Sequence, residues 1–166
     1  IITVENKANY VSMPYEEETL IIFSHGFFSP LECEFLRKLL AVLPDVEFYH
    51  TGDLDYGGVR IFRHIREHVC PRVRPLSMDA EQYDHYIQRG YEIKPETLKK
   101  LEDMRGTEPL MEELIEHMIK GKMGIEQECF LICWKSEERK SECEVTLGND
   151  RMDIDEPSVE VLAVSR

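Results

Sequence analysis

Short apolar runs alternate with helix-periodic segments through the first half of the chain. The runs that read as strands are Ile1–Glu5, Thr19–Ser24, Val46–Thr51 and Val73–Leu76. The segments between them repeat apolar residues at helical spacing and are predicted as helices over Asn6–Met13, Ser29–Leu43 and Tyr56–Val69. This alternation predicts an α/β fold with a parallel sheet of about four strands flanked by helices. In such sheets, ligand sites form where strands end and helices begin.

The second half of the chain is predicted to be mostly helical. The expected helices are Asp79–Gln88, Pro95–Met104, Glu108–Lys120 and Ile125–Trp134. The third carries an apolar stripe, which we interpret as core, formed by Leu110, Met111, Leu114, Ile115, Met118 and Ile119. From Lys135 the sequence becomes acidic and weakly patterned. We therefore predict one domain over residues 1–134, followed over 135–166 by a frayed acidic tail or a short hairpin of Cys143–Leu147 and Val159–Val164.

The composition is typical of a globular protein outside the membrane. Hydrophobic residues make up 42% of the 166 residues and charged residues 32%, and the apolar runs are strand-sized, so no membrane partner is expected. The five cysteines are odd in number and include no CxxC pair, which favours reduced thiols and a cytoplasmic location. Because the chain opens directly on a strand and without Met, we expect it to be part of a longer protein.

The charge is distributed unevenly along the chain. The net charge of −13 does not favour nucleic-acid binding over the whole surface. Between positions 60 and 74, however, Glu67 is the only acid among a group of basic residues, namely Arg60, Arg63, Arg66, Arg72 and Arg74. This basic stripe indicates either a local contact for DNA or a solvated helix face.

Two carboxylates follow the third predicted strand. Asp53 and Asp55 flank one residue, and alternate side chains of an extended chain point the same way, so both should converge on one spot. Paired carboxylates suit a hard divalent cation such as Mg²⁺ or Mn²⁺. Gly57-Gly58 then leads into a helix whose N-terminus favours anions. A solvated turn or a helix cap is the alternative interpretation. Glu5, at the end of the first strand, should reach the same edge and either share the metal or transfer protons.

These residues carry a resemblance to a known family. Glu5-Asn6 after a first strand and Gly52-Asp53-Leu54-Asp55 after a later strand resemble the Toprim domain of topoisomerases, primases and certain nucleases. The resemblance implies that Glu5, Asp53 and Asp55 are catalytic and bind Mg²⁺ or Mn²⁺.

Longer segments narrow the resemblance. Thr3–Lys7, His50–Ile61 and Gly124–Glu128 are similar to the C-terminal domain of the JetD-like nuclease subunit of Wadjet anti-plasmid systems. They are similar, more distantly, to the catalytic subunit of topoisomerase VI. The likeness covers residues 1–134. It implies a preceding DNA-binding region, double-stranded DNA as substrate, condensin-like partner subunits and a possible homodimer.

Glu126 and Glu128 lie on the segment that matches the family's Glu-Gln-Glu and are candidate additional metal ligands. Two acids two residues apart do not face together on a regular helix, so a capping or surface role is the alternative.

The first functional hypothesis is a metal-dependent DNA endonuclease whose DNA backbone is held by Lys7, Arg60, Arg63 and Arg66. No tyrosine carries a motif that marks a nucleophile, which favours hydrolysis by a metal-activated water over transesterification. The sequence has no GxxxxGK[ST] phosphate loop, which argues against an ATPase. Two other hypotheses remain: a topoisomerase-like or recombinase-like domain that supports strand transfer, and a non-catalytic module that binds metal or nucleotide.

Overall fold

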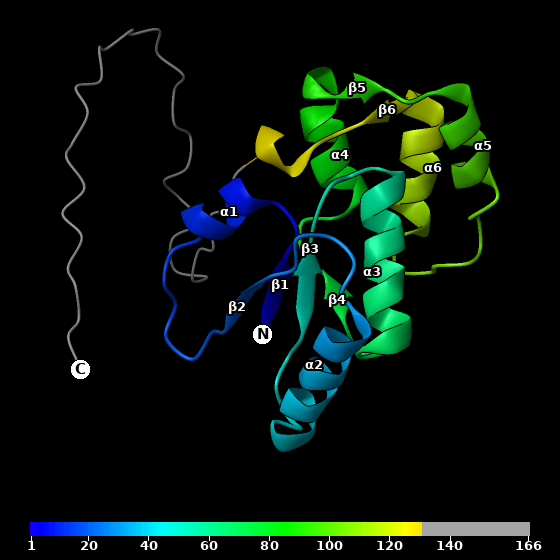
Figure 1. Ribbon diagram of the computed structural model, residues 1–166. Coiled ribbons are helices and arrows are strands. Elements are labelled where there is room, and N and C mark those ends of the chain that lie inside the picture. The colour runs from blue at the N-terminus through cyan, green and yellow to red at the C-terminus, as the bar shows by residue number, and fades with distance from the viewer. Residues whose placement is uncertain (131–166) are drawn as a thin grey trace, which may run out of the picture. The chain divides into compact units, whose positions relative to one another are not determined.

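Four short strands form a parallel sheet at the centre of the fold. A computed structural model describes residues 1–130 of the chain (Figure 1). The strands are β1 (Ile2–Val4), β2 (Ile21–Phe23), β3 (Tyr49–Thr51) and β4 (Arg74–Pro75). They lie in the order β2-β1-β3-β4, and every pair is parallel. The predicted α/β class with a four-stranded parallel sheet is confirmed.

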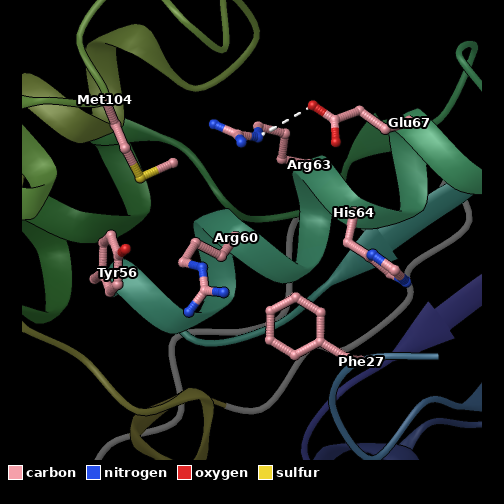
Figure 2. Close-up of a pocket in the computed structure, with 7 residues that line it drawn as sticks. All are labelled: Phe27, Tyr56, Arg60, Arg63, His64, Glu67 and Met104. Atoms are coloured by element: carbon pink, nitrogen blue, oxygen red, sulfur yellow. Dashed lines mark ion pairs between the residues drawn. The ribbon is translucent and has the colours of Figure 1, made fainter. Parts of the chain in front are cut away.

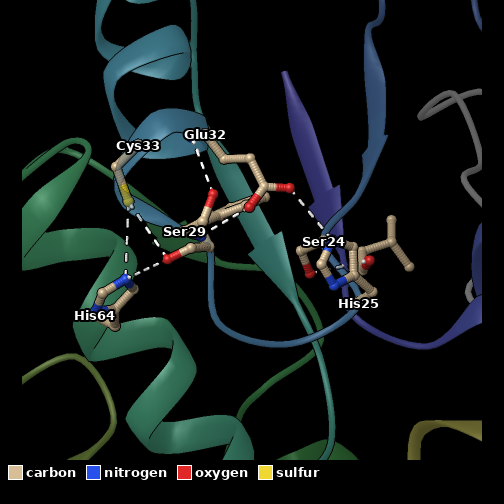
Figure 3. Close-up of polar contacts among 8 residues, drawn as sticks. Ser24, His25, Ser29, Glu32, Cys33 and His64 are labelled. Carbon is tan, nitrogen blue, oxygen red and sulfur yellow. Dashed lines mark hydrogen bonds and ion pairs between the residues drawn. The ribbon is translucent and has the colours of Figure 1, made fainter.

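Three helices connect the strands. They are α1 (Lys7–Ser12), α2 (Pro30–Val42) and α3 (Tyr56–His68). Because parallel crossovers are right-handed, the chain places α1 on one face of the sheet and α2 and α3 on the other, as Figure 1 shows. The side chains of Cys33 on α2 and His64 on α3 meet, with the sulfur 3.8 Å from Nε2 (Figure 3).

A capping box starts α2 at the predicted residue. The Ser29 hydroxyl accepts from the Glu32 N–H at 3.4 Å, and the Glu32 carboxylate accepts from the Ser29 N–H at 2.7 Å (Figure 3). Pro30 occupies the first turn, where its missing N–H is not needed. These reciprocal bonds satisfy two donors that the helix itself leaves free.

The core lies between the sheet and its helices. The inner face of α3 is completely buried at Val59, Phe62 and Ile65. On α2 the buried side chains are Cys33, Leu36 and Leu40. The opposite side of α2 is apolar but exposed, at Leu31, Phe35 and Val42. Helical spacing thus predicts α2 correctly, although half of its apolar residues face outward.

A second group of elements follows the sheet. It contains α4 (Ala80–Tyr86), the short 3₁₀ helix η1 (Ile87–Arg89), α5 (Pro95–Glu102) and α6 (Glu112–Gly121), with an antiparallel pair β5 (Tyr91–Glu92) and β6 (Met123–Gly124). The stripe predicted as core is buried at Met111, Leu114, Ile115 and Met118, but Leu110 precedes the helix and is 47% exposed. None of the helices in residues 1–130 has the length and apolar character that crossing a membrane requires.

The prediction of a helix over Ile125–Trp134 is wrong where the structure describes it. Lys122 adopts a left-handed conformation, with φ of 56°, and ends α6. Ile125 then exchanges both backbone hydrogen bonds with Leu54, at 2.8 and 3.0 Å. Only the 3₁₀ turn η2 (Gln127–Cys129) follows. Backbone pairing with a segment some seventy residues earlier has overridden the local apolar pattern. The predicted tail over 135–166, with its candidate strands, lies outside the described residues.

Candidate acidic site at the sheet edge

The candidate site lies where the direction of the chain through the sheet reverses. From β1 the chain moves outward to β2, and from β3 it moves outward to β4 on the other side. Residues that leave β1 and β3 therefore flank a crevice at the carboxyl edge of the sheet, which is where ligands bind in open α/β sheets. Glu5 follows β1 and Asp53 follows β3, two positions after its end.

Glu5 and Asp53 are neighbours at this edge. The Glu5 N–H donates to the Thr51 carbonyl at 3.0 Å, and the Asp53 N–H donates to Glu5 Oε2 at 3.4 Å. A Cβ on Gly52 would stand 2.3 Å from the same Glu5 oxygen. Glycine at position 52 therefore leaves the space in which the Glu5 carboxylate lies across the end of β3.

Asp55 has two hydrogen-bond partners that fix its carboxylate. Its Oδ1 accepts from the Gly58 N–H at 2.8 Å and so caps α3, and its Oδ2 accepts from the Tyr91 hydroxyl at 2.7 Å. A Cβ on Gly124, which pairs with Tyr91 across β5 and β6, would lie 2.7 Å from the Tyr91 ring and 3.2 Å from the Asp55 Cβ. The helix cap that the sequence offers as an alternative is present, next to the other carboxylates.

Gln127 brings a third segment to the site and is fully buried. Its N–H donates to Asp53 Oδ1 at 2.7 Å, and its side-chain amide donates to the Thr51 hydroxyl at 2.8 Å. Its amide oxygen accepts from the Asn6 N–H at 3.1 Å. One side chain thus joins the ends of β1 and β3 to the segment after β6.

Glu126 and Glu128 flank Gln127 and are exposed. Glu126 is extended, with φ of −71° and ψ of 140°, and Glu128 Oε1 accepts from the Asn6 side chain at 3.2 Å. Because the segment is not a regular α-helix, the geometric objection to both acids facing one site does not apply.

Tyr91 and Gln127 are the residues that sequence reasoning missed. Tyr91 lies in a segment with no strand pattern, and it reaches Asp55 only through the β5–β6 pairing. Gln127 lies between Glu126 and Glu128, and only these two acids were predicted as candidate metal ligands in this segment. The family's Glu-Gln-Glu was the only signal that pointed to this segment.

The acidic side chains weaken one another's ionisation. Burial, together with the Asp53 charge, raises the pKa of Glu5 to about 7. Burial raises the pKa of Asp53 to about 6, and the charges of Asp55, Glu126 and Glu128 add to this effect, although the Gln127 hydrogen bond opposes it. The edge of the sheet therefore holds more negative charge than its surroundings stabilise.

His50 lies beneath this edge as a neutral residue. It is fully buried, and burial lowers its pKa to about 3. Its Nδ1 meets the Thr3 hydroxyl at 2.9 Å, whereas Nε2 has no hydrogen-bond partner among the described residues. The His50 Nε2 atom would lie 3.3 Å from a Cβ on Gly52, so the imidazole ring lies close to the position that the Glu5 carboxylate covers. It therefore adds no positive charge to the site near neutral pH.

The donor set fits a hard divalent cation. Oxygen donors predominate, and the pKa values of Glu5 and Asp53 are raised mainly by burial and further by neighbouring negative charges, which a cation would offset. Within residues 1–130, no three His, Cys, Asp or Glu side chains are gathered closely enough to ligate one ion as they stand. Glu5 and Asp53 are in contact, and exposed Glu126 and Glu128 are free to change rotamer.

The predicted basic residues divide into distinct environments. Arg66 forms an ion pair with Glu108, whose side chain is only 2% exposed. Arg63 pairs with Glu67 one turn along α3, at 3.2 Å. Arg60 lies over aromatic rings, and Lys7 is exposed in the first turn of α1.

The raised pKa values predict a pH-dependent stability difference for Glu5→Gln. The folded protein keeps protons on Glu5 and Asp53 that the unfolded chain releases, so their ionisation weakens folding as pH rises from about 4.5 to about 7. Glutamine removes one of these charges. We expect the variant to be more stable than the wild type by less than about 1 kcal/mol at pH 5 and by about 2 kcal/mol at pH 8.

Urea unfolding at the two pH values measures this difference. Glu92→Gln, at an exposed position, is the control. Its stability difference from the wild type should be the same at pH 5 and pH 8. A Glu5→Gln difference that is the same at pH 5 and pH 8 would contradict the prediction.

Together, the fold and the site define an α/β domain with a carboxylate cluster at its topological switch point. Residues 1–139 match the family described as Wadjet protein JetD, C-terminal, and the chain belongs to that family. It is similar to the Wadjet protein JetD of Bacillus cereus (strain Q1), with 34% identity over 135 residues. That alignment covers 77% of this chain and 32% of the relative, so the chain spans about a third of the relative's length. The resemblance to the JetD-like C-terminal domain is confirmed.

Proposed function

We propose that this chain is the Toprim-type catalytic domain of a divalent-metal-dependent DNA endonuclease. The observation that carries the proposal is the cluster of carboxylates at the switch point of the sheet, where Glu5 and Asp53 are neighbours and burial and nearby negative charge raise the pKa of each. Such crowding of buried carboxylates destabilises the folded state unless a positive charge offsets it, and carboxylates with perturbed pKa values in a crevice are typical of catalytic sites.

Glu5, Asp53 and Asp55 would hold Mg²⁺ or Mn²⁺, with Glu126 and Glu128 as further ligands. When bound, the cation activates water and stabilises the charge that develops on the leaving oxygen. Gln127 fixes one oxygen of Asp53, and the Gly58 N–H and the Tyr91 hydroxyl fix those of Asp55. In the absence of the cation, burial and the Asp53 charge raise the pKa of Glu5, so this carboxyl is also a candidate to accept and return a proton.

The substrate in this proposal is double-stranded DNA. The first turn of α3 begins directly after Asp55, and helix N-termini favour phosphate groups. Lys7, Arg60 and Arg63 would contact the DNA backbone, and none of them is paired with a buried acid within residues 1–130. Arg66 contributes less in this reading, because it compensates Glu108. A pocket of about 340 Å³ beside Asp55 and Tyr91 leaves room next to the carboxylates.

Family membership supports the biological setting. We place the activity in plasmid defence, together with condensin-like Wadjet subunits and a possible second copy of this chain. The free thiols of Cys33, Cys70 and Cys129 favour a cytoplasmic location. The relative's greater length is consistent with a DNA-binding region elsewhere in the full protein.

Strand transfer, as in topoisomerase VI, is the second candidate, because the Tyr91 hydroxyl contacts Asp55. A tyrosine nucleophile must lose its proton. Burial raises the pKa of Tyr91, and its hydrogen bond to Asp55 raises it further, so hydrolysis is favoured. Covalent protein–DNA adducts that survive denaturation and vanish in Tyr91→Phe would support strand transfer instead.

Plasmid cleavage by the full-length protein with its partner subunits tests the proposal. Asp53→Asn is expected to lower the cleavage rate at least about 100-fold, because Asp53 is the carboxylate at the centre of the cluster. Asp45→Asn, in an exposed turn, is the matched control and should cleave at the wild-type rate. Cleavage that Asp53→Asn leaves unchanged would refute an enzymatic role for the site and favour a non-catalytic module.

A further inference from the structure

A pocket opens beside α3. It has a volume of about 190 Å³, and its lining includes Phe27, Tyr56, Arg60, His64 and Met104 (Figure 2). Tyr56 is the first residue of α3 and directly follows Asp55. The pocket therefore adjoins the carboxylate cluster, although none of Glu5, Asp53 and Asp55 lines it.

Arg60 lies between two aromatic rings in this pocket. Its guanidinium carbon is 5.2 Å from the centroid of Phe27 and 5.5 Å from that of Tyr56 (Figure 2). Lys100 approaches the Tyr56 ring as well, at 5.8 Å. Arg63 is paired with Glu67, but no carboxylate in residues 1–130 forms an ion pair with Arg60. The pocket thus holds two aromatic rings and the Arg60 guanidinium, while Glu67, the acid in its lining, is paired with Arg63.

These groups fit a flat ring that is attached to a negative charge. Aromatic side chains and guanidinium planes are the surfaces on which unstacked nucleobases stack, and Arg60 and Lys100 complement the adjoining phosphates. An aromatic side chain of a protein partner would also stack here. The nucleotide is favoured because the pocket adjoins the N-terminus of α3 and Asp55, where the proposed function places the scissile phosphate.

We propose that this pocket takes one unstacked nucleobase of the DNA substrate. The inference rests on the proposed function and deepens it, since it assigns a DNA conformation to the site. A base held by Phe27, Tyr56 and Arg60 has to leave the duplex stack, which is least costly at a mismatch, a bend or an unpaired position. The enzyme would then favour distorted over relaxed duplex.

Fluorescence of 2-aminopurine, placed at an unpaired position of an otherwise paired oligonucleotide, tests the inference with the full-length protein. The wild type should quench the fluorescence on binding, because the base stacks in the pocket. Phe27→Ala should weaken binding to this DNA about tenfold and abolish the quenching, while binding to fully paired DNA stays the same. Phe27 is 44% exposed, so its removal should leave the fold intact.

Phe35→Ala is the matched control, since Phe35 is an exposed phenylalanine that does not line the pocket. Tyr56→Leu removes the second ring and should reproduce the Phe27→Ala result. Unchanged quenching in both pocket variants would overturn the inference. So would loss of partner-protein binding with intact DNA binding, which would assign the pocket to a protein contact.

The test of the pocket and the test of the proposed nuclease function can fail independently of each other. Asp53→Asn leaves the pocket residues in place and should still quench 2-aminopurine. If that variant also cleaves DNA at the wild-type rate, the nuclease proposal fails while the pocket stands. If it loses cleavage and Phe27→Ala quenches normally, the nuclease stands and the pocket assignment fails.

Discussion

Alanine at position 58 is expected to destabilise the protein by about 4 kcal/mol or more, which is exceptional for one added methyl group. A Cβ there would lie 2.0 Å from the Asp53 carbonyl oxygen and 2.9 Å from its carbonyl carbon. Both atoms are backbone, so no side-chain rotation relieves the overlap. The start of α3 would have to move away from Asp53, and the Asp55 cap on the Gly58 N–H would be lost with it.

Gly57→Ala is the matched control for this prediction. A Cβ at position 57 would lie 3.1 Å from Asp55 Oδ1, which belongs to a side chain, and alanine is favoured over glycine in a helix by up to about 1 kcal/mol. We expect a change within about 1 kcal/mol of the wild type. Urea unfolding of Gly58→Ala and Gly57→Ala measures the difference in stability. Equal urea midpoints would show that the start of α3 can shift to accommodate the added methyl group without strain.

Arg66→Ala is expected to destabilise the protein by about 3 kcal/mol, because it leaves Glu108 buried without its partner. The Glu108 side chain is 2% exposed, so water cannot replace the guanidinium. The Arg66 side chain is 32% exposed, which places the effect at the lower end for a broken buried pair. Glu108→Gln in the same chain removes the stranded charge and should restore part of the loss.

Arg63→Ala, on the same helix, provides the comparison. Its partner Glu67 is half-exposed, and pairs of this kind contribute about 0.5 kcal/mol or less. Chemical unfolding measures stability, and DNA binding to the full-length protein is measured alongside it. If Arg66→Ala weakened DNA binding while its stability stayed at the wild-type level, Arg66 would belong to the DNA contact that the sequence suggests.

Much of the sheet could be predicted because its signals are local. The strand runs and the helices α2 and α3 follow from apolar spacing and from Ser29-Pro30 within one stretch of chain. Parallel order then places the ends of β1 and β3 at one edge, which explains why the sequence alone predicts Glu5 and Asp53 side by side. Their roles as metal ligands and catalytic groups remain predictions.

The parts that could not be predicted depend on pairings between distant segments. Tyr91 reaches Asp55 only because β5 pairs with β6, and Ile125 is extended only because it pairs with Leu54. Neither two-residue strand has a periodicity that distinguishes it from a turn. The same limit explains the wrong helix after Gly124, since apolar spacing carries no information about a partner strand seventy residues away.

The hydrogen bond from Gln127 to Asp53 joins residues 74 positions apart and has a consequence for biosynthesis. Synthesis proceeds from the N-terminus, so a growing chain presents Glu5, Asp53 and Asp55 long before Gln127 exists. Until then the ends of β1 and β3 lack the Gln127 side chain that hydrogen-bonds to both, and Asp53 Oδ1 lacks the Gln127 N–H donor. Contacts of such long sequence separation form late in folding. A nascent chain would therefore carry the acids of the site without their final arrangement, and the proposed nuclease site would be complete only once the whole domain has been synthesised.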